Sequence, residues 1–321
     1  MRRRDFISLL GAAAMAPSAW PLAARAQAKI PRVGFFWPSF PEPNMGVAGL
    51  REGLKERGYV LGRNLVLEER YAEGHPERTR DLIQELLALG VDVLATTDYA
   101  LILAHTLTAT VPIVGVAADF VGVGLAASLA HPGGNVTGLS LLSAEFAPKW
   151  LELLKAAVPT MRRVAFLATF SGFVALEKRG LDEAAPRFGV TLTQLDMYPG
   201  NIEESLAAIT SASFDGLIVA DEGEALIPQI VARAAEIRMP AIYGLGAAVH
   251  AGGLMSYSAD SFALWRQAAG FIDRILKGSR PGDLPIEQAT AIKFAVNLQT
   301  AKALGLDIPP TLLAAADEVI E

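Results

Sequence analysis

The chain has 321 residues, of which 52% are hydrophobic, and it carries a formal net charge of −6 with no cysteine. This acidic balance disfavours nucleic acid and anionic membrane surfaces as partners, and no basic stripe with interleaved aromatic residues overrides it. The lack of cysteine excludes a disulfide framework and also a lipid-modified cysteine.

The first 27 residues have the pattern of an export signal. Arg2, Arg3 and Arg4 precede a moderately apolar run, Pro21 breaks it, and alanines at positions 24 and 26 form an A-x-A cleavage site. We expect residues 1–26 to be removed before Gln27, which leaves 24 basic and 33 acidic residues and a net charge of −9. The arginines resemble a twin-arginine signal, which would place the mature protein in the periplasm. An ordinary secretory signal and an uncleaved anchor are the alternatives, although the apolar run is shorter than the ~20 residues that span a bilayer.

From residue 31 onward, short apolar runs alternate with longer amphipathic stretches, which is typical of βαβ units around parallel sheets. The first half predicts strands at 32–36, 65–70, 91–95, 113–116 and 136–139, and helices at 46–57, 77–89 and 100–108. The segment 91–95 is almost wholly apolar, as in a strand that helices cover on both faces.

The second half repeats this pattern. It predicts strands at 164–168, 191–195, 216–219 and 241–243, and helices at 147–157, 176–188, 202–210 and 225–237. The tail adds a strand at 254–257, a helix at 262–277, a strand at 292–297 and a helix at 298–304. We therefore expect an α/β protein of two doubly wound parallel-sheet lobes joined by a three-strand hinge, with connections near 139, 252 and 286. Lobe one would comprise 28–138 and 253–285, and lobe two 139–252 and 286–321.

Polar and aromatic residues that follow the predicted strands are the candidates for a ligand site, because strand carboxyl ends face the crevice of such folds. They are Trp37, Ser39, Thr96, Thr97, Asp98, Tyr99, Asp119 and Phe120 in lobe one, and Ser143, Phe170, Asp221 and Tyr243 in lobe two. Thr169, Ser171 and Glu222 lie in the same loops of lobe two.

Each candidate has a functional and a structural interpretation. Thr96 and Thr97 suit a carboxylate at a helix start, or they cap that helix, and Asp98 could equally be the cap. Asp119 and Asp221 suit a ligand ammonium, or they stabilise turns. The aromatic side chains could stack on a flat ligand or pack within the lobes.

Signatures of enzymes are weak in this sequence. The four histidines at positions 75, 105, 131 and 250 have no metal-ligand spacing, and no GxSxG nucleophile elbow occurs. Gly122, Gly124 and Ala127 match a loose dinucleotide fingerprint, but not directly after the first strand where it belongs. We expect no catalysis, no cofactor and no metal.

Several long segments resemble a known family: GLKERGYVLGRNL, HPGGNVTGLS, AGGLMSYSAD and the C-terminal NLQTAKALGLDIPPTLLAAADEVIE. Together with the N-terminal signal, they resemble the bacterial ABC-transporter substrate-binding proteins of the TrpX-like group, which have the type I periplasmic binding protein fold. The resemblance implies a small organic ligand, amino acid-like or an aromatic carboxylate, that is captured between two lobes and delivered to a membrane permease and its ATPase. It matches Asp119 and Asp221 to acidic strand-end residues of the family.

The sequence departs from its relatives at two loops. Asp98 and Tyr99 stand where relatives continue with proline, and 168–173 lack their Asn-Pro-rich segment. A fixed negative charge at residue 98 disfavours a carboxylate beside Thr96 and Thr97, so these departures predict an unusual ligand. A ligand-sensing partner of a membrane receptor and an exported α/β enzyme are the alternative functions, and we expect a monomer.

Overall fold

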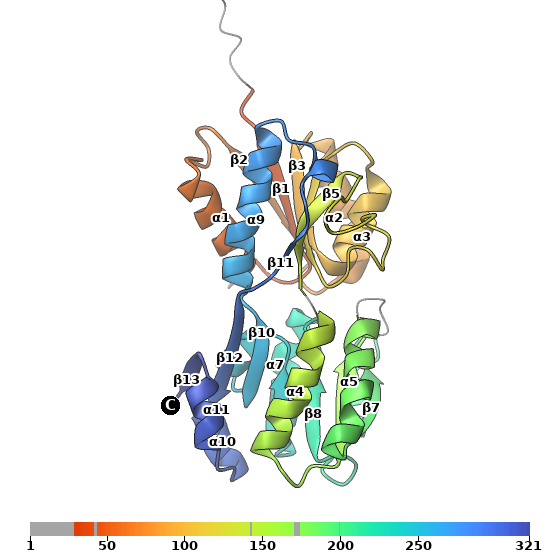
Figure 1. Ribbon diagram of the computed structural model, residues 1–321, viewed down its shortest axis with the longest axis vertical. Coiled ribbons are helices and arrows are strands. Elements are labelled where there is room, and N and C mark those ends of the chain that lie inside the picture. Colours follow the sequence, from red (N-terminus) through yellow and green to blue (C-terminus); the bar gives the residue numbers. More distant parts are fainter. Residues whose placement is uncertain (1–28, 42–43, 142, 170–173, 199) are drawn as a thin grey trace, which may run out of the picture. The chain divides into compact units, whose positions relative to one another are not determined.

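Two separate sheets organise the computed structural model, which describes residues 29–41, 44–141, 143–169, 174–198 and 200–321 (Figure 1). The predicted export signal therefore lies outside the described residues. The first sheet has the order β11-β5-β4-β3-β1-β2, and every neighbouring pair in it is parallel. Its strands are β1 (Arg32–Trp37), β2 (Val66–Tyr71), β3 (Val93–Thr97), β4 (Ile113–Ala117), β5 (Val136–Ser140) and β11 (Glu287–Gln288).

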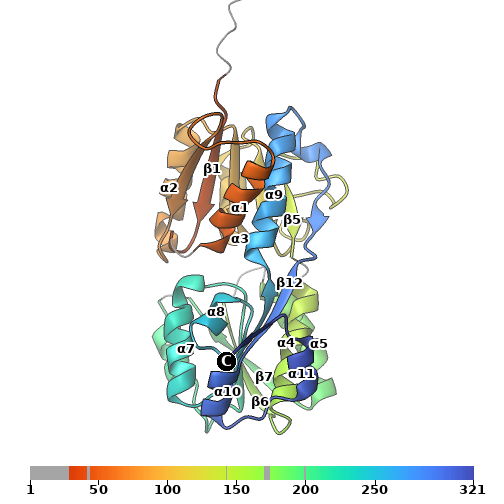
Figure 2. The same cartoon turned by 90° about the vertical axis from the view of Figure 1, so that its left-hand side faces the viewer.

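Helices cover both faces of the first sheet. Helices α1 and α9 lie side by side on one face, and α2 and α3 lie on the other (Figure 2). Consequently β3, β4 and β5 are buried along their whole lengths, as the apolar run at 91–95 predicts. The helical elements are α1 (Met45–Glu56), η1 (Pro76–Arg78), α2 (Thr79–Ala88), α3 (Asp98–Leu107), α9 (Ser261–Leu276) and η3 (Pro281–Asp283).

The second sheet has the order β13-β12-β10-β9-β8-β6-β7, in which β10 and β12 form the antiparallel pair. Helices α4 and α5 pack against each other beside it, and α7 contacts α8 (Figures 1 and 2). The strands are β6 (Arg163–Ala168), β7 (Thr191–Asp196), β8 (Gly216–Val219), β9 (Ala241–Tyr243), β10 (Met255–Ala259), β12 (Ile292–Asn297) and β13 (Glu318–Ile320). The helical elements are α4 (Ser143–Ala157), α5 (Val174–Phe188), α6 (Ile202–Ala208), η2 (Glu224–Leu226), α7 (Ile227–Glu236), α8 (Ala247–His250), α10 (Leu298–Leu304) and α11 (Pro310–Ala315).

Local polar residues set the helix boundaries. Asn44 precedes α1, and its side chain accepts a hydrogen bond from Val47 N at 3.0 Å. Asp260 accepts from Ala263 N at 3.1 Å before α9 in the same way. Each contact satisfies an amide that the first helical turn leaves unpaired. At the end of α10, Gly305 adopts a left-handed φ of 73°, which favours glycine.

The structure confirms two doubly wound α/β sheets. The residues at which the chain passes from one sheet to the other differ from those predicted. Strand β10, in a segment expected in lobe one, pairs with β9 and β12 of the second sheet. Strand β11, expected in lobe two, pairs with β5 of the first. The three connections therefore follow Ser140, Ala259 and Ala289 rather than residues 139, 252 and 286. A short strand shows no periodicity that reveals which sheet it joins, and pairing across the chain decides it.

Most predicted helices begin at other residues, and the largest shift is at α4, which starts at Ser143 rather than residue 147. The helix predicted at 77–89 begins as the short turn η1 before α2, and that predicted at 225–237 begins as η2 before α7. Helix α3 starts at Asp98, two residues before its predicted start. Residues 31–321 form one compact unit. Among the described residues, no helix combines the length and apolarity needed to cross a membrane.

Candidate functional site

Each sheet has one point where its strand order reverses. In the first sheet this point lies between β1 and β3, because β1 is flanked by β2 on one side and by β3 on the other. In the second sheet it lies between β6 and β8. Loops that leave the carboxyl ends of such strands diverge to opposite faces and open a crevice, which is where open α/β sheets bind ligands. Trp37 ends β1 and Asp98 directly follows β3, while Thr169 and Asp221 follow β6 and β8.

A set of carboxyl groups gathers at these two points. Asp98 belongs to the first sheet, and burial together with the negative charges of Asp221 and Glu222 raises its pKa to about 8. The Thr97 hydroxyl, whose Oγ1 lies 2.9 Å from Asp98 Oδ2, acts in the opposite direction. Because Asp221 and Glu222 follow β8 of the second sheet, acidic side chains from both sheets share one electrostatic environment.

Glu177 in the first turn of α5 is the most deeply buried member of this set. Its exposed fraction is 1%, and its Oε2 has no hydrogen-bond partner. Burial, followed by the charge of Asp221 and a hydrogen bond with it, raises the pKa of Glu177 well above its usual value. Burial also raises the pKa of Asp221, whereas the hydrogen bond from Glu177 opposes that rise. Burial and their mutual contact therefore favour the protonated form at this pair of carboxyl groups.

Glu222 connects these carboxyl groups to Thr169, the residue that follows β6. Its Oε1 accepts a hydrogen bond from Thr169 N at 2.6 Å, and burial raises the pKa of its carboxyl group despite that bond. We call Asp98, Glu177, Asp221 and Glu222 the acidic cluster.

The backbone at Asp98 is held in an uncommon conformation. Its φ is +46°, in the left-handed region that aspartate tolerates better than most residues. Thr97 does not cap α3 with its side chain, and its Oγ1 instead lies 2.8 Å from Val116 O. The capping interpretation of Thr97 is therefore wrong. Strained backbone of this kind is common where a side chain must point into a site.

Trp37 links the two sheets directly. Its Nε1 donates a hydrogen bond to Glu224 Oε2 at 2.9 Å, and burial raises the pKa of Glu224 against the effect of that bond. The indole ring stacks on Phe35 with ring centres 5.7 Å apart and meets Trp265 edge-on at 6.0 Å. These aromatic contacts and the hydrogen bond to Glu224 fix the orientation of the ring.

Several predicted site residues serve the fold instead. Asp119 Oδ1 accepts from Val121 N and Gly122 N at 3.0 and 2.8 Å, so its carboxylate closes a turn. Phe120 is fully buried in the core below α2 and α3, which rules out stacking on a ligand. The burial of Phe120 argues against its ligand-binding assignment, whereas the assignment of Asp119 stays a prediction.

The remaining candidates are spread more widely. Tyr99 is 59% exposed, whereas Tyr243 is 1% exposed with its hydroxyl unpaired and its pKa raised by burial. Thr96 is fully buried and its Oγ1 has no partner, and Ser39 is 5% exposed. Phe170 lies outside the described residues, and the side chain of Ser143 does too. The structure thus brings Asp98 and Asp221 together and leaves the other assignments as proposals.

Sequence reasoning missed Glu177 and Glu224. Glu177 lies at helical spacing with Val174, Leu181 and Ala184 on the buried face of α5, where a charged residue is unusual. A charged residue on this otherwise apolar helix face could have identified Glu177 from the sequence. No signal in the sequence identifies Glu224, because its partner Trp37 is 187 residues away in the chain.

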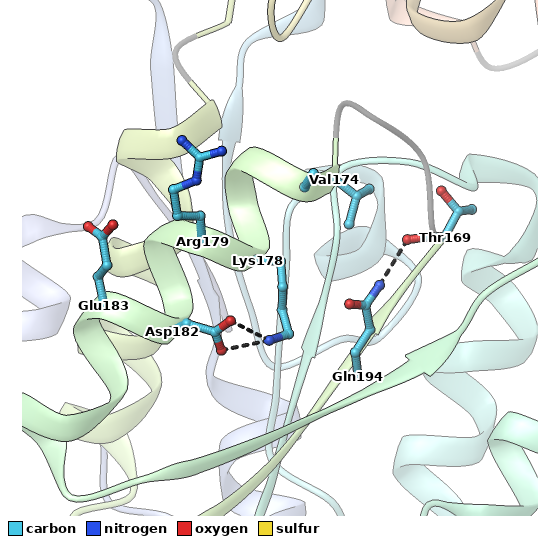
Figure 3. Close-up of a pocket in the computed structure, with 8 residues that line it drawn as sticks. Thr169, Val174, Lys178, Arg179, Asp182, Glu183 and Gln194 are labelled. Carbon is cyan, nitrogen blue, oxygen red and sulfur yellow. Dashed lines mark hydrogen bonds and ion pairs between the residues drawn. The ribbon is translucent and has the colours of Figure 1, made fainter. Parts of the chain in front are cut away.

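A pocket of about 480 Å³ lies between α5 and β7 (Figure 3). In it, Lys178 Nζ forms an ion pair with Asp182 Oδ2, and Gln194 Nε2 donates to Thr169 O at 3.0 Å. Its lining is Thr169, Val174, Ala175, Lys178, Arg179, Asp182, Glu183 and Gln194, all from the second sheet's side. Among the described residues, no group of three or more histidine and acidic side chains could hold a metal ion.

The chain is similar to several known proteins, two of which are described by an amino acid ligand. A tyrosine-binding protein of Clostridioides difficile is 24% identical over 277 residues, which cover 83% of this chain and 78% of the relative. A Streptococcus pneumoniae structure in complex with L-Trp has a TM-score of 0.83 at 24% identity and covers 90% of this chain and 99% of its own. A conserved domain protein of Vibrio cholerae has a TM-score of 0.84 at 25% identity, with coverage of 91% and 100%.

These likenesses place the two sheets in the type I periplasmic binding protein fold. The model of the family described as "ABC transporter substrate binding protein" matches residues 40–320, which include the acidic cluster and every strand of the two sheets except β1. Its members are binding proteins rather than enzymes, in agreement with the absence of catalytic motifs in the sequence. The chain therefore belongs to the family of ABC transporter substrate-binding proteins.

Proposed function

We propose that this protein captures a small organic ligand outside the cytoplasm, between its two sheets, and delivers it to an ABC importer in the inner membrane. The family supports the transport role, and the signal-like first 26 residues support export to the periplasm. We further propose that the protein acts as a monomer, since a hinge protein presents both lobes to a permease.

The observation that carries this proposal is the acidic cluster at the reversal points of both sheets. Asp98 follows a strand of the first sheet and Asp221 one of the second, and the charge of Asp221 contributes to the raised pKa of Asp98. A ligand that contacts both residues stabilises the arrangement in which the sheets approach, which is how a hinge protein couples binding to closure.

The ligand class that the relatives suggest is amino acid-like and aromatic. Tyrosine and tryptophan are the ligands named for two of them. An ammonium group would lie at Asp221 and Asp98, and Trp37, at the end of the strand next to β3, would offer a flat apolar face. A carboxylate without an ammonium group fits less well, because it would meet carboxyl groups of like charge.

The test begins with the exported protein as it is purified. We expect mass spectrometry of the molecules released on unfolding to show a small organic compound. That compound should raise the melting temperature of the stripped protein, because it binds only the folded state. If nothing is released, and no compound in a broad library of amino acids, amines and carboxylates stabilises the protein, ligand capture is excluded.

A ligand-sensing role would use the same site but a different partner. Liganded protein added to the reconstituted permease and ATPase should stimulate ATP hydrolysis, while stripped protein should not. Stimulation that is equal with and without ligand would contradict delivery.

A further inference from the structure

We propose that the hydrogen bond between Trp37 and Glu224 is a latch that holds the two sheets together without a contribution from any ligand. Trp37 ends β1 of the first sheet, and Glu224 is the first residue of η2, which follows β8 of the second. The indole Nε1 donates to Glu224 Oε2 at 2.9 Å. Because both groups belong to the protein, this inference goes beyond ligand capture and does not depend on which ligand is bound.

The donor of the latch is held firmly by the first sheet and its helices. The indole ring of Trp37 stacks on Phe35 with ring centres 5.7 Å apart and meets Trp265 edge-on at 6.0 Å. On the side of α1, a Cβ built on Gly46 would lie 2.9 Å from Cζ3 of the ring, so the helix backbone packs directly against it. A ring enclosed in this way keeps one rotamer. The hydrogen bond is therefore broken by movement of the sheets rather than by rotation of the side chain.

The acceptor belongs to a turn that packs on the second sheet. Gly223, directly before η2, has a left-handed φ of 72°, and its carbonyl accepts from Leu226 N at 2.8 Å. A Cβ on Gly223 would lie 3.0 Å from Cε of Met197, the residue that follows β7. Burial raises the pKa of Glu224, whereas the hydrogen bond from Trp37 lowers it. The cost of removing this carboxylate from water offsets part of the gain from the hydrogen bond, so the latch can open.

A second contact lies beside the hydrogen bond and involves different atoms. Gly74, in the loop after β2, lies against Ala225 of η2, because a Cβ built on Gly74 would be 2.9 Å from the Ala225 Cβ. This loop is joined to the end of β1: Ala72 N donates to Trp37 O at 3.0 Å, and Gly74 N donates to Pro38 O at 3.1 Å. Two loops of the first sheet therefore form one surface that packs against η2.

These contacts change the equilibrium between a closed arrangement of the sheets, in which they form, and an open one. A hydrogen bond to a charged group that is held at both ends favours the closed arrangement by about ten-fold. A ligand then has to supply less of the free energy of closure. Loss of the latch should open the ligand-free protein without unfolding either sheet.

Indole N–H resonances report the latch directly. The experiment uses the exported protein after unfolding and refolding have removed bound small molecules, with no ligand added. Trp150 is an internal reference, because its Nε1 donates to Tyr257 O at 2.6 Å within the elements of the second sheet. We expect the Trp37 resonance, assigned with Trp37→Phe, to show a hydrogen-bonded proton. Glu224→Ala should shift it and speed its exchange with solvent about ten-fold, while the Trp150 resonance stays in place.

Small-angle X-ray scattering of the same samples measures whether the sheets separate. Glu224→Ala should raise the radius of gyration, whereas the matched control Glu203→Ala, at an exposed position of α6, should not. Gly74→Ala places a methyl group against Ala225 and should raise it as well. The control for this variant is Gly62→Ala. Gly62 has a φ of 77°, close to the 80° of Gly74, but its Cβ would meet no atom within 4 Å, so only the contact differs.

Trp37→Phe provides a second way of removing the latch if Glu224→Ala folds poorly. It keeps an aromatic ring in the stack and removes the donor, so it should raise the radius of gyration too. A rise in the Glu224, Trp37 and Gly74 variants, with both controls unchanged, supports the latch.

Two results would overturn this inference. One is a Trp37 resonance without a hydrogen bond in the ligand-free wild type. The other is a radius of gyration in Glu224→Ala and Trp37→Phe equal to that of the wild type, which would show that the hydrogen bond does not hold the sheets together. Since no ligand is present, either result leaves ligand capture standing, and a protein that captured no ligand could still show the latch.

Discussion

Asp98, the first residue of α3, combines three properties that rarely occur together. It stands in a left-handed backbone conformation, its carboxyl group faces Asp221 and Glu222, and its pKa is raised to about 8. The sequence shows that Asp98 follows a strand, but this position predicts none of the three properties. The chemistry of the site therefore depends on contacts between segments more than a hundred residues apart.

Asp98 should make the ligand-free protein less stable as pH rises. Its carboxyl has a pKa of about 8 in the folded chain and about 3.9 in the unfolded chain, so between these values the folded state binds more protons. The free energy of unfolding then falls as pH increases from about 4 to about 8, and stays level above that. Asp98→Asn should reduce the loss between pH 5.5 and pH 8.5 by about 1–3 kcal/mol.

Urea denaturation at the two pH values measures this effect, with Asp307→Asn as the control that should keep the wild-type slope. The same pH dependence in Asp98→Asn as in the wild type would show that this carboxyl group is not desolvated in the folded protein. Glu177, Asp221 and Glu222 should leave a residual slope in the same direction, because their pKa values are raised as well.

At the scale of elements, the contact between α1 and α9 depends on glycine. A Cβ built on Gly53 would lie 2.4 Å from Arg266 O, and one on Gly49 would lie 2.1 Å from Phe262 O. These backbone atoms cannot move aside as a flexible side chain can. The helices approach so closely because α1 offers hydrogen atoms where other residues have a methyl group.

Gly53→Ala should therefore destabilise the protein by about 1–2 kcal/mol, even though alanine favours helices by about 1 kcal/mol. Gly270→Ala in the partner helix α9 is the matched control. Its Cβ would meet only the guanidinium end of Arg57, with 3.0 Å as the closest approach, so we expect no loss of stability. Thermal unfolding of both variants tests the contact, and equal melting temperatures for the two would contradict it.

Most strands and helices could be predicted from sequence because their signals are local. The strands at 216–219, 241–243 and 292–297 and the helix at 298–304 match the structure residue for residue. The sheet that β10 and β11 join could not be predicted, because a strand's partners are chosen by packing and not by its own pattern. Short elements such as α8 and β13 were missed for the same reason: they contain too few residues to show a period.

The site was predictable only in part. The positions of Asp98 and Asp221 follow from the rule that strand carboxyl ends line the crevice. The contacts of Asp119 and Phe120 do not follow from this rule. The sequence does not show whether a carboxylate closes a turn or whether an aromatic ring packs in the core. Glu177 became recognisable only when α5 placed its carboxyl group beside Asp221.

At the scale of the whole molecule, polar side chains of the described residues connect the regions of the two sheets. Trp37 and Glu224 form a hydrogen bond across them, and Asp98 faces the carboxyl groups of the second sheet. The hydrogen bond favours approach of the two sheets. Repulsion between the carboxylates opposes it unless a cation or protons neutralise their charge. Such a balance allows a ligand of the right charge to decide whether the sheets close.

The most direct test is a crystal structure of the exported protein with the compound that it releases on unfolding. We expect a nitrogen of that compound within about 3 Å of carboxyl oxygens of both Asp98 and Asp221, with contacts to both sheets. A ligand that occupies only the pocket between α5 and β7, or that turns a carboxylate towards Asp98, would contradict the account.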